Sequence, residues 1–90
     1  MENQQSMQVY EKIKPRLNAI QQEVYGLLKE FGPMTLMELD ETYCYLHYMD
    51  RVTSTARSRA NELKKLSPPL VRVVGTGIYK GARGMKIRIS

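Results

Sequence analysis

The chain has 90 residues, one cysteine (Cys44) and a formal net charge of +5. This length is typical of one domain with a modest core, and a single cysteine excludes intramolecular disulfides and cysteine-based zinc sites. No apolar run is long enough to span a membrane, and the first residues lack the pattern of a secretory signal, so we expect a cytoplasmic protein without membrane contact.

The charge is distributed unevenly along the chain. Residues 1–33 are neutral overall, whereas residues 34–50 carry four acids and no lysine or arginine, a net charge of −4. Residues 51–90 carry ten basic side chains against Glu62 alone, a net charge of +9. This asymmetry predicts a half that binds a polyanion, with nucleic acid favoured over a membrane surface, and an acidic region that faces elsewhere.

Residues 1–14 are expected to form a frayed tail or a short helix that begins near Ser6. Met7, Tyr10 and Ile13 recur there at helical spacing. The apolar side chains of residues 7–13 are also candidates for a homodimer contact.

The strongest helical periodicity follows Pro15, a residue that suits the first turn of a helix. Apolar side chains then recur at helical spacing as far as Phe31. Gly32 and Pro33 end this helix, because glycine adopts the left-handed cap conformation and proline cannot continue a helix.

A second helix is predicted after Thr35, because Thr35 and Glu38 have the spacing of a capping box. Residues 33–35, just before it, are extended and suit a minimal strand. Residues 43–50 either extend this helix or form an aromatic-rich loop; we favour a helix to about Leu46, followed by a turn near Asp50.

Residues 51–66 have the pattern of an amphipathic helix with a narrow apolar stripe and a basic, polar opposite face. The stripe consists of Val52, Ala56, Ala60 and Leu63. Either Thr53 or Ser54 caps the helix. Such a helix is suited to a DNA groove, although an ordinary solvated surface helix has the same pattern.

The last part of the chain predicts a β-hairpin. Residues 70–74 are rich in β-branched side chains, and residues 85–89 alternate apolar and basic side chains. Residues 75–84 hold four of the six glycines, which indicates a long, flexible connection with Lys80 and Arg83 near its tip.

Three helices followed by a two-stranded ribbon resemble the winged helix-turn-helix family of DNA-binding proteins, in particular its small phage and bacterial regulators. The similarity covers about residues 15–89 and rests on the segments EFGPMT, TLMEL, RVTSTARSRANELKKL and LVRVV. It implies an α+β domain over residues 15–90, a three-helix bundle followed by a hairpin wing. It also implies double-stranded DNA binding in transcription regulation or another DNA transaction, without metal or cofactor.

In that family the third helix enters the major groove and the wing contacts the DNA backbone. The resemblance therefore assigns base reading to Ser54, Thr55, Arg57, Ser58 and Asn61. It assigns phosphate contacts to Arg51, Arg59, Lys64, Lys65, Lys80 and Arg83. Arg57 has the geometry for guanine and Asn61 the geometry for adenine. The link between the second and third helices is longer than the family's usual turn, which leaves their relative angle open.

A protein-interaction module in a replication or transcription assembly is the main alternative, because fold does not fix function. Its working surface would be the acidic, tyrosine-rich residues 34–50, and the region from Tyr43 to Tyr48 is a second candidate for dimer contact. RNA binding ranks lower, because no aromatic RNA-binding motif is present. An enzyme is not expected, because neither Cys44 nor His47, the only histidine, belongs to a catalytic motif.

Overall fold

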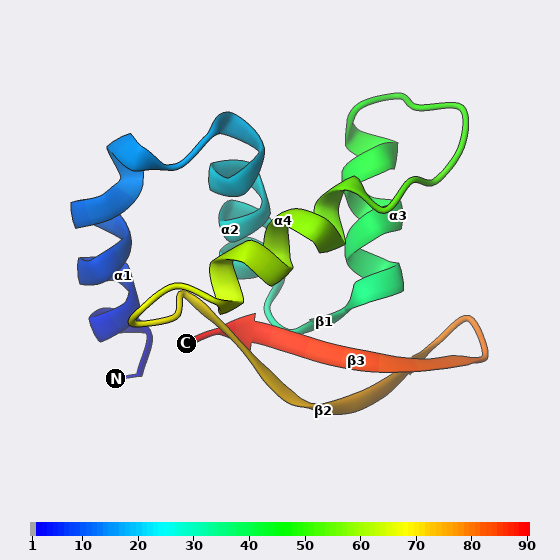
Figure 1. Cartoon of the computed structure of the whole chain (residues 1–90). Helices are drawn as coiled ribbons and strands as arrows, with labels where there is room; N and C mark the ends of the chain where they lie inside the picture. Colours follow the sequence, from blue (N-terminus) through cyan, green and yellow to red (C-terminus); the bar gives the residue numbers. More distant parts are fainter. Residues whose placement is uncertain (1) are drawn as a thin grey trace.

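The computed structural model describes residues 2–90, with side chains described from Gln8 onward. It confirms the predicted α+β class, a helical bundle followed by an antiparallel hairpin (Figure 1). The elements in chain order are α1 (Glu2–Ile13), the 3-10 turn η1 (Lys14–Arg16), α2 (Ala19–Phe31), β1 (Met34–Thr35), α3 (Leu36–Leu46), α4 (Thr55–Lys64), β2 (Val71–Tyr79) and β3 (Ala82–Ile89).

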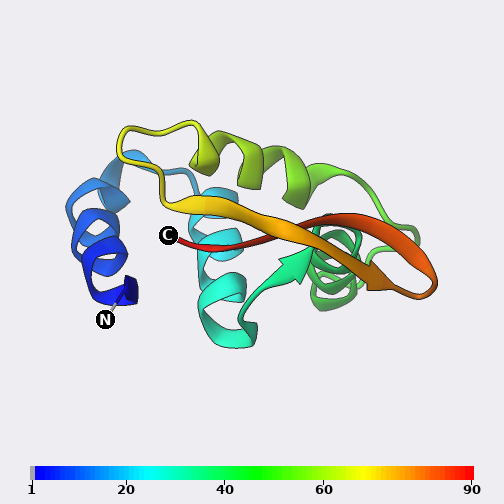
Figure 2. The same ribbon diagram turned by 90° about the horizontal axis from the view of Figure 1, so that it is seen from below.

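The described strands form one antiparallel sheet in the order β1-β3-β2. The minimal strand predicted at residues 33–35 is confirmed as β1, in which Met34 pairs with Ile87. Figures 1 and 2 show the hairpin extending along the bundle and past it, with its tip on the side of α3. The core lies between α2, α3, α4 and the base of the sheet, with Leu28, Leu39 and Leu63 almost completely buried.

The start of α2 differs from the prediction. Pro15 lies in η1, and α2 begins only at Ala19 because Leu17 is extended and interrupts the helical path. Asn18 and Gln21 then form a capping box, in which each side chain accepts a hydrogen bond from the other residue's backbone N–H, at 2.8 and 3.0 Å. The predicted end is confirmed at Gly32, which has φ 81°.

The N-terminal helix is longer than expected. Of the two alternatives for residues 1–14, the structure has the helix, but α1 begins at Glu2 and not near Ser6; glutamate and glutamine in this stretch have favourable helix propensity. Tyr10 stacks on Tyr25 of α2, with ring centroids 3.9 Å apart and planes within 5°. This contact attaches α1 to the bundle; the side chain of Met7, also proposed for a dimer contact, lies outside the described residues.

The helix predicted over residues 51–66 is shorter, because α4 spans Thr55–Lys64. Val52 is therefore not part of the apolar stripe; it lies in the preceding loop with 53% of its surface exposed. The other stripe residues, Ala56, Ala60 and Leu63, are buried as predicted. Ser54 occupies the cap position but its side chain makes no capping hydrogen bond.

The long, flexible connection predicted within the hairpin is wrong. The strands continue to a two-residue turn, where Lys80 and Gly81 both have positive φ (52° and 80°), the geometry that matches the twist of paired strands. The other three glycines of residues 75–84 lie within the strands, Gly75 and Gly77 in β2 and Gly84 in β3. Gly77 pairs with Gly84, and a Cβ on Gly77 would lie 3.1 Å from the Thr35 side chain, so a larger residue would disturb the contact with β1.

Candidate nucleic-acid interface

One face of α4 points away from the core. At about 100° per residue, the face opposite the buried stripe carries Ser54, Ser58, Asn61 and Lys65. None of these four side chains makes a hydrogen bond or ion pair within the described part of the chain. Their hydroxyl, amide and amine groups are thus available to a ligand.

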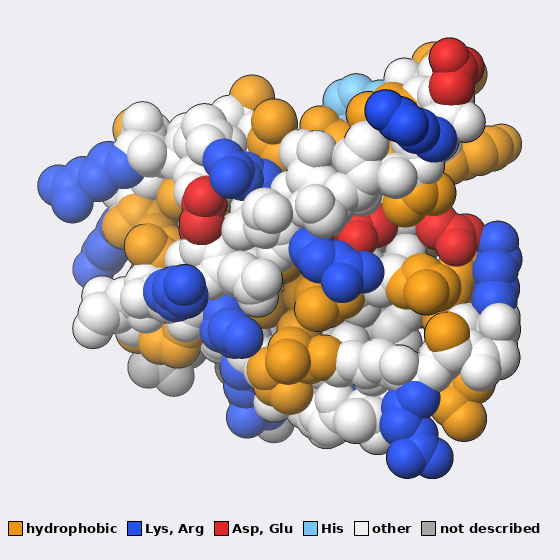
Figure 3. Space-filling model, turned by 45° about the vertical axis from the view of Figure 1, so that its right-hand side comes forward, with side chains coloured by type: hydrophobic (Ala, Val, Ile, Leu, Met, Phe, Trp, Pro, Cys, Tyr) orange, Lys and Arg blue, Asp and Glu red, His pale blue; other side chains and the backbone are white. Residues whose placement is uncertain are grey.

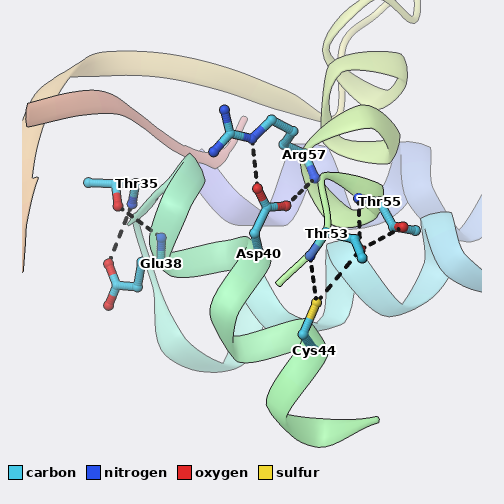
Figure 4. Close-up of polar contacts among 7 residues, drawn as sticks. All are labelled: Thr35, Glu38, Asp40, Cys44, Thr53, Thr55 and Arg57. Atoms are coloured by element: carbon cyan, nitrogen blue, oxygen red, sulfur yellow. Dashed lines mark hydrogen bonds and ion pairs between the residues drawn. The ribbon is translucent and has the colours of Figure 1, made fainter. Parts of the chain in front are cut away.

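Arg57 lies on the flank of α4 that faces α3, where it contacts Asp40 (Figure 4). The Arg57 backbone N–H and its side-chain Nε donate to the two oxygens of the Asp40 carboxylate, at 2.9 and 2.7 Å. The carboxylate is 4% exposed, whereas the Arg57 side chain is 40% exposed. Figure 4 shows the terminal guanidinium nitrogens turned away from Asp40, and they make no hydrogen bond within the described residues.

Asp40 therefore supplies the cap that Ser54 does not. The backbone N–H of Arg57 is one of the donors in the first turn of α4 that lack a partner within the helix. A carboxylate at this end also interacts favourably with the helix dipole. Asp40 was missed as a site residue, although an acid on the same helical stripe as Leu39 and Tyr43 was a signal that it points inward.

A second contact holds the loop that leads into α4. Thr53 donates its backbone N–H to the buried Cys44 Sγ, at 3.4 Å, and the Thr53 and Thr55 hydroxyls are 3.0 Å apart (Figure 4). Thr55, a predicted base reader, is therefore engaged within the protein. His47 has a different partner from Cys44, since its Nε2 lies 2.6 Å from Glu23 on α2.

Arg59 is ion-paired within α4, with its Nη2 atom 3.0 Å from Glu62. Gln21 of α2 donates to the other oxygen of the same carboxylate, at 2.7 Å. Glu62, the only acid of residues 51–90, thus connects α4 to α2. Arg59, predicted to contact phosphate, is partly neutralised at this position.

The tip of the hairpin contacts α3 through Glu41. Lys80 Nζ donates to Glu41 Oε1 at 2.7 Å, and the Tyr79 hydroxyl donates to the same oxygen at 3.2 Å. The hydrogen bond from Lys80 lowers the pKa of Glu41, and that bond in turn raises the pKa of Lys80. Desolvation, followed by the hydrogen bond to Glu41, raises the pKa of Tyr79.

These contacts correct the expectation that the acidic segment faces elsewhere. Asp40 and Glu41 both pair with cations of the basic half, Arg57 and Lys80. The reason is that α3 packs against both α4 and strand β3 of the hairpin, so its acids meet basic side chains that are distant in sequence.

The remaining predicted phosphate ligands make no ion pair within the part of the chain described. They are Arg51, Lys64, Lys65 and Arg83. Arg83 lies in β3 opposite Ile78 rather than at the turn. Figure 3 shows blue side chains spread over the face that carries α4 and the hairpin, with red side chains among them near α3.

Apolar side chains are exposed beside this face. Tyr48 and Tyr45, in and before the loop between α3 and α4, are 93% and 80% exposed. Tyr43, by contrast, is buried in the core, with its ring tilted by 35° against that of His47, so it is not available for a dimer contact at the surface.

A scan against protein-family models, a search of curated proteins and a search of solved structures each found no significant match to this chain. Within the described residues, no helix combines the length and apolar character needed to cross a membrane. No cluster of three or more His, Cys, Asp or Glu side chains suited to a metal ion occurs there either.

Proposed function

We propose that this protein binds double-stranded DNA as a winged helix-turn-helix domain, with α4 in the major groove and the β2–β3 hairpin as the wing. The observation that carries this proposal is the outward face of α4, where Ser54, Ser58, Asn61 and Lys65 have no partner within the described residues. The order of elements from α2 to β3 also supports it, because a helix that crosses two others and precedes a hairpin is the arrangement of that family.

The residues divide into two roles under this proposal. Asn61 and Ser58 read base edges, since an amide pairs with adenine and a hydroxyl with several bases. Arg57 adds a reader on the flank, because Asp40 holds Nε while both terminal nitrogens stay available for the two acceptors of guanine. Lys64 and Lys65 bind phosphates, which position the helix without reading sequence.

The test is titration of a labelled random duplex at low salt, followed by titrations at increasing salt. We expect binding whose logarithmic affinity falls linearly with the logarithm of salt concentration, because each phosphate contact releases counterions. Binding that is absent, or that does not respond to salt, contradicts the proposal.

Two double variants test whether α4 is the surface that contacts DNA. Replacing Lys64 and Lys65 together by Ala should weaken binding to all sequences and reduce the salt slope by about two, because each lysine neutralises one phosphate. The matched control is the double change of Lys12 and Lys29 to Ala, which removes the same charge from exposed positions on α1 and α2. If the two double variants weaken binding equally, α4 is not the contact surface.

A protein-interaction function is the second candidate, and the exposure of Tyr45 and Tyr48 favours it. Exposed aromatic side chains are enriched where proteins bind one another. A partner recovered by pulldown should be lost when both tyrosines are changed to Ser and retained when Lys64 and Lys65 are changed to Glu. The opposite pattern argues against this function.

A further inference from the structure

The hairpin tip is held on α3 by a contact that occupies the wing's own cation. Lys80 is the first residue of the two-residue turn, and its Nζ donates to Glu41 at 2.7 Å while lying 5.5 Å from the centre of the Tyr79 ring. The Tyr79 hydroxyl donates to the same carboxylate oxygen. The Glu41 carboxylate therefore accepts hydrogen bonds from the two residues that precede Gly81, Tyr79 and Lys80.

The ion pair between Lys80 and Glu41 can separate without burying either charge. The Lys80 side chain is 65% exposed and that of Glu41 25% exposed, so both groups keep their access to water when the pair separates. Exposed ion pairs contribute little free energy, and a phosphate can replace the carboxylate as partner of the amine. The pair between Asp40 and Arg57 differs, because its carboxylate is buried and also holds a backbone N–H.

Resting on the proposed function, we propose that Glu41 is an intramolecular competitor of the DNA phosphate for Lys80, and so limits the affinity of the wing. In the free protein the carboxylate holds the tip against α3. On binding, the amine exchanges Glu41 for a phosphate oxygen, so the contact with Glu41 must be broken and the net gain from the phosphate is smaller.

The test compares duplex affinity in four proteins: the unmodified chain, Glu41→Gln, Lys80→Ala and the double variant. Glu41→Gln should bind about two- to fivefold more tightly, the range expected when an exposed ion pair no longer opposes binding. This gain should vanish in the Lys80→Ala background, because the competition requires the amine. A gain that persists without Lys80 is a general charge effect and overturns the proposal.

The matched control is Glu30→Gln, which removes one negative charge at an exposed α2 position that makes no ion pair within the described residues. An equal gain in this variant also overturns the competition. Failure of the proposed function is distinguishable, because then none of the four proteins binds the duplex at any salt concentration. Duplex binding by all four with no difference between Glu41 and Gln rejects the competition alone.

Discussion

Asp40 binds the first turn of α4 to α3. Its carboxylate accepts the backbone N–H and the Nε of Arg57, and it does so from a position where only 4% of the side chain is exposed. Removing a buried acceptor leaves its donors unsatisfied, which costs more than the net contribution of the hydrogen bonds themselves. The first turn of α4 should therefore be sensitive to this one side chain.

We expect Asp40→Ala to reduce the free energy of unfolding by about 2 kcal/mol, since it removes both a helix cap and a charge-assisted hydrogen bond. Asp40→Asn should cost less, because the amide oxygen still accepts the Arg57 backbone N–H. Urea denaturation measures both changes. Asp50→Asn is the control, as Asp50 is exposed and unpaired within the described residues; a destabilisation equal to that of Asp40→Ala would contradict the assignment.

At the scale of a single element, α2 has one glycine in its interior and another at its C-cap, and the two have opposite effects on the helix. Gly26 lies in the helix interior on the exposed side, and a Cβ there would meet nothing within 4 Å. Gly32 ends the helix with φ 81° and ψ −162°, a region that is essentially restricted to glycine. A Cβ on Gly32 would also meet nothing within 4 Å, so backbone conformation alone separates the two sites.

The same substitution should consequently have opposite effects. Gly26→Ala should stabilise the protein by about 0.5–1 kcal/mol, because alanine reduces the entropy of the unfolded chain and favours the helix. Gly32→Ala should destabilise it by about 1–3 kcal/mol, the cost of a strained backbone conformation. Thermal unfolding of both variants provides the comparison, and a Gly32→Ala variant that is not destabilised would show that the helix does not end as described.

At the scale of the whole molecule, α3 links the two elements of the proposed interface. Adjacent acids of α3 make the connections, Asp40 to α4 and Glu41 to the hairpin. The positions of α4 and of the hairpin tip are thus both set relative to α3. Since the Glu41 contact involves groups that titrate, this part of the arrangement depends on pH.

The hydrogen bond from Lys80 holds the pKa of Glu41 below its ordinary value of 4.5. The stabilising contribution of this carboxylate is therefore complete above pH 4.5 and is lost as the pH falls through the lowered pKa. The amine behaves oppositely: Glu41 raises the pKa of Lys80 above 10.5, so its contribution is complete below that pH and is lost as the pH rises through the raised value.

A carboxyl ¹³C titration should give a midpoint for Glu41 below 4.5, and the midpoint should rise towards 4.5 in Lys80→Ala. Tyr79→Phe should raise it less, because the Tyr79 hydroxyl is the weaker of the two donors. Nearby Glu38 acts on Tyr79 as well, so Glu38→Gln is a useful control with an intact Lys80. An unchanged Glu41 midpoint in Lys80→Ala would mean that the tip does not rest on α3 in solution.

Local signals in the sequence were sufficient for most of the helices and their ends. The capping box of Thr35 and Glu38, the stop at Gly32 and the buried stripe Ala56, Ala60 and Leu63 all follow from residues within one or two helical turns of each other. The hairpin turn was missed because residues 75–84 are rich in glycine, and only strand pairing shows which glycines lie in strands. The start of α4 was also placed too early, because its cap is supplied by Asp40 of α3 and no side chain next to it in sequence caps it.

The amino-acid sequence by itself determined the fold class, the apolar faces of α2 and α4 and the concentration of positive charge in the second half. Only the tertiary structure decided which of those charges are already paired. Asp40 and Arg57 are 17 positions apart and Glu41 and Lys80 are 39 apart, so their contacts depend on the path of the chain between them. The composition gives the number of charges. Which of them are paired depends on how α3 packs against α4 and the hairpin, because that packing brings Asp40 to Arg57 and Glu41 to Lys80.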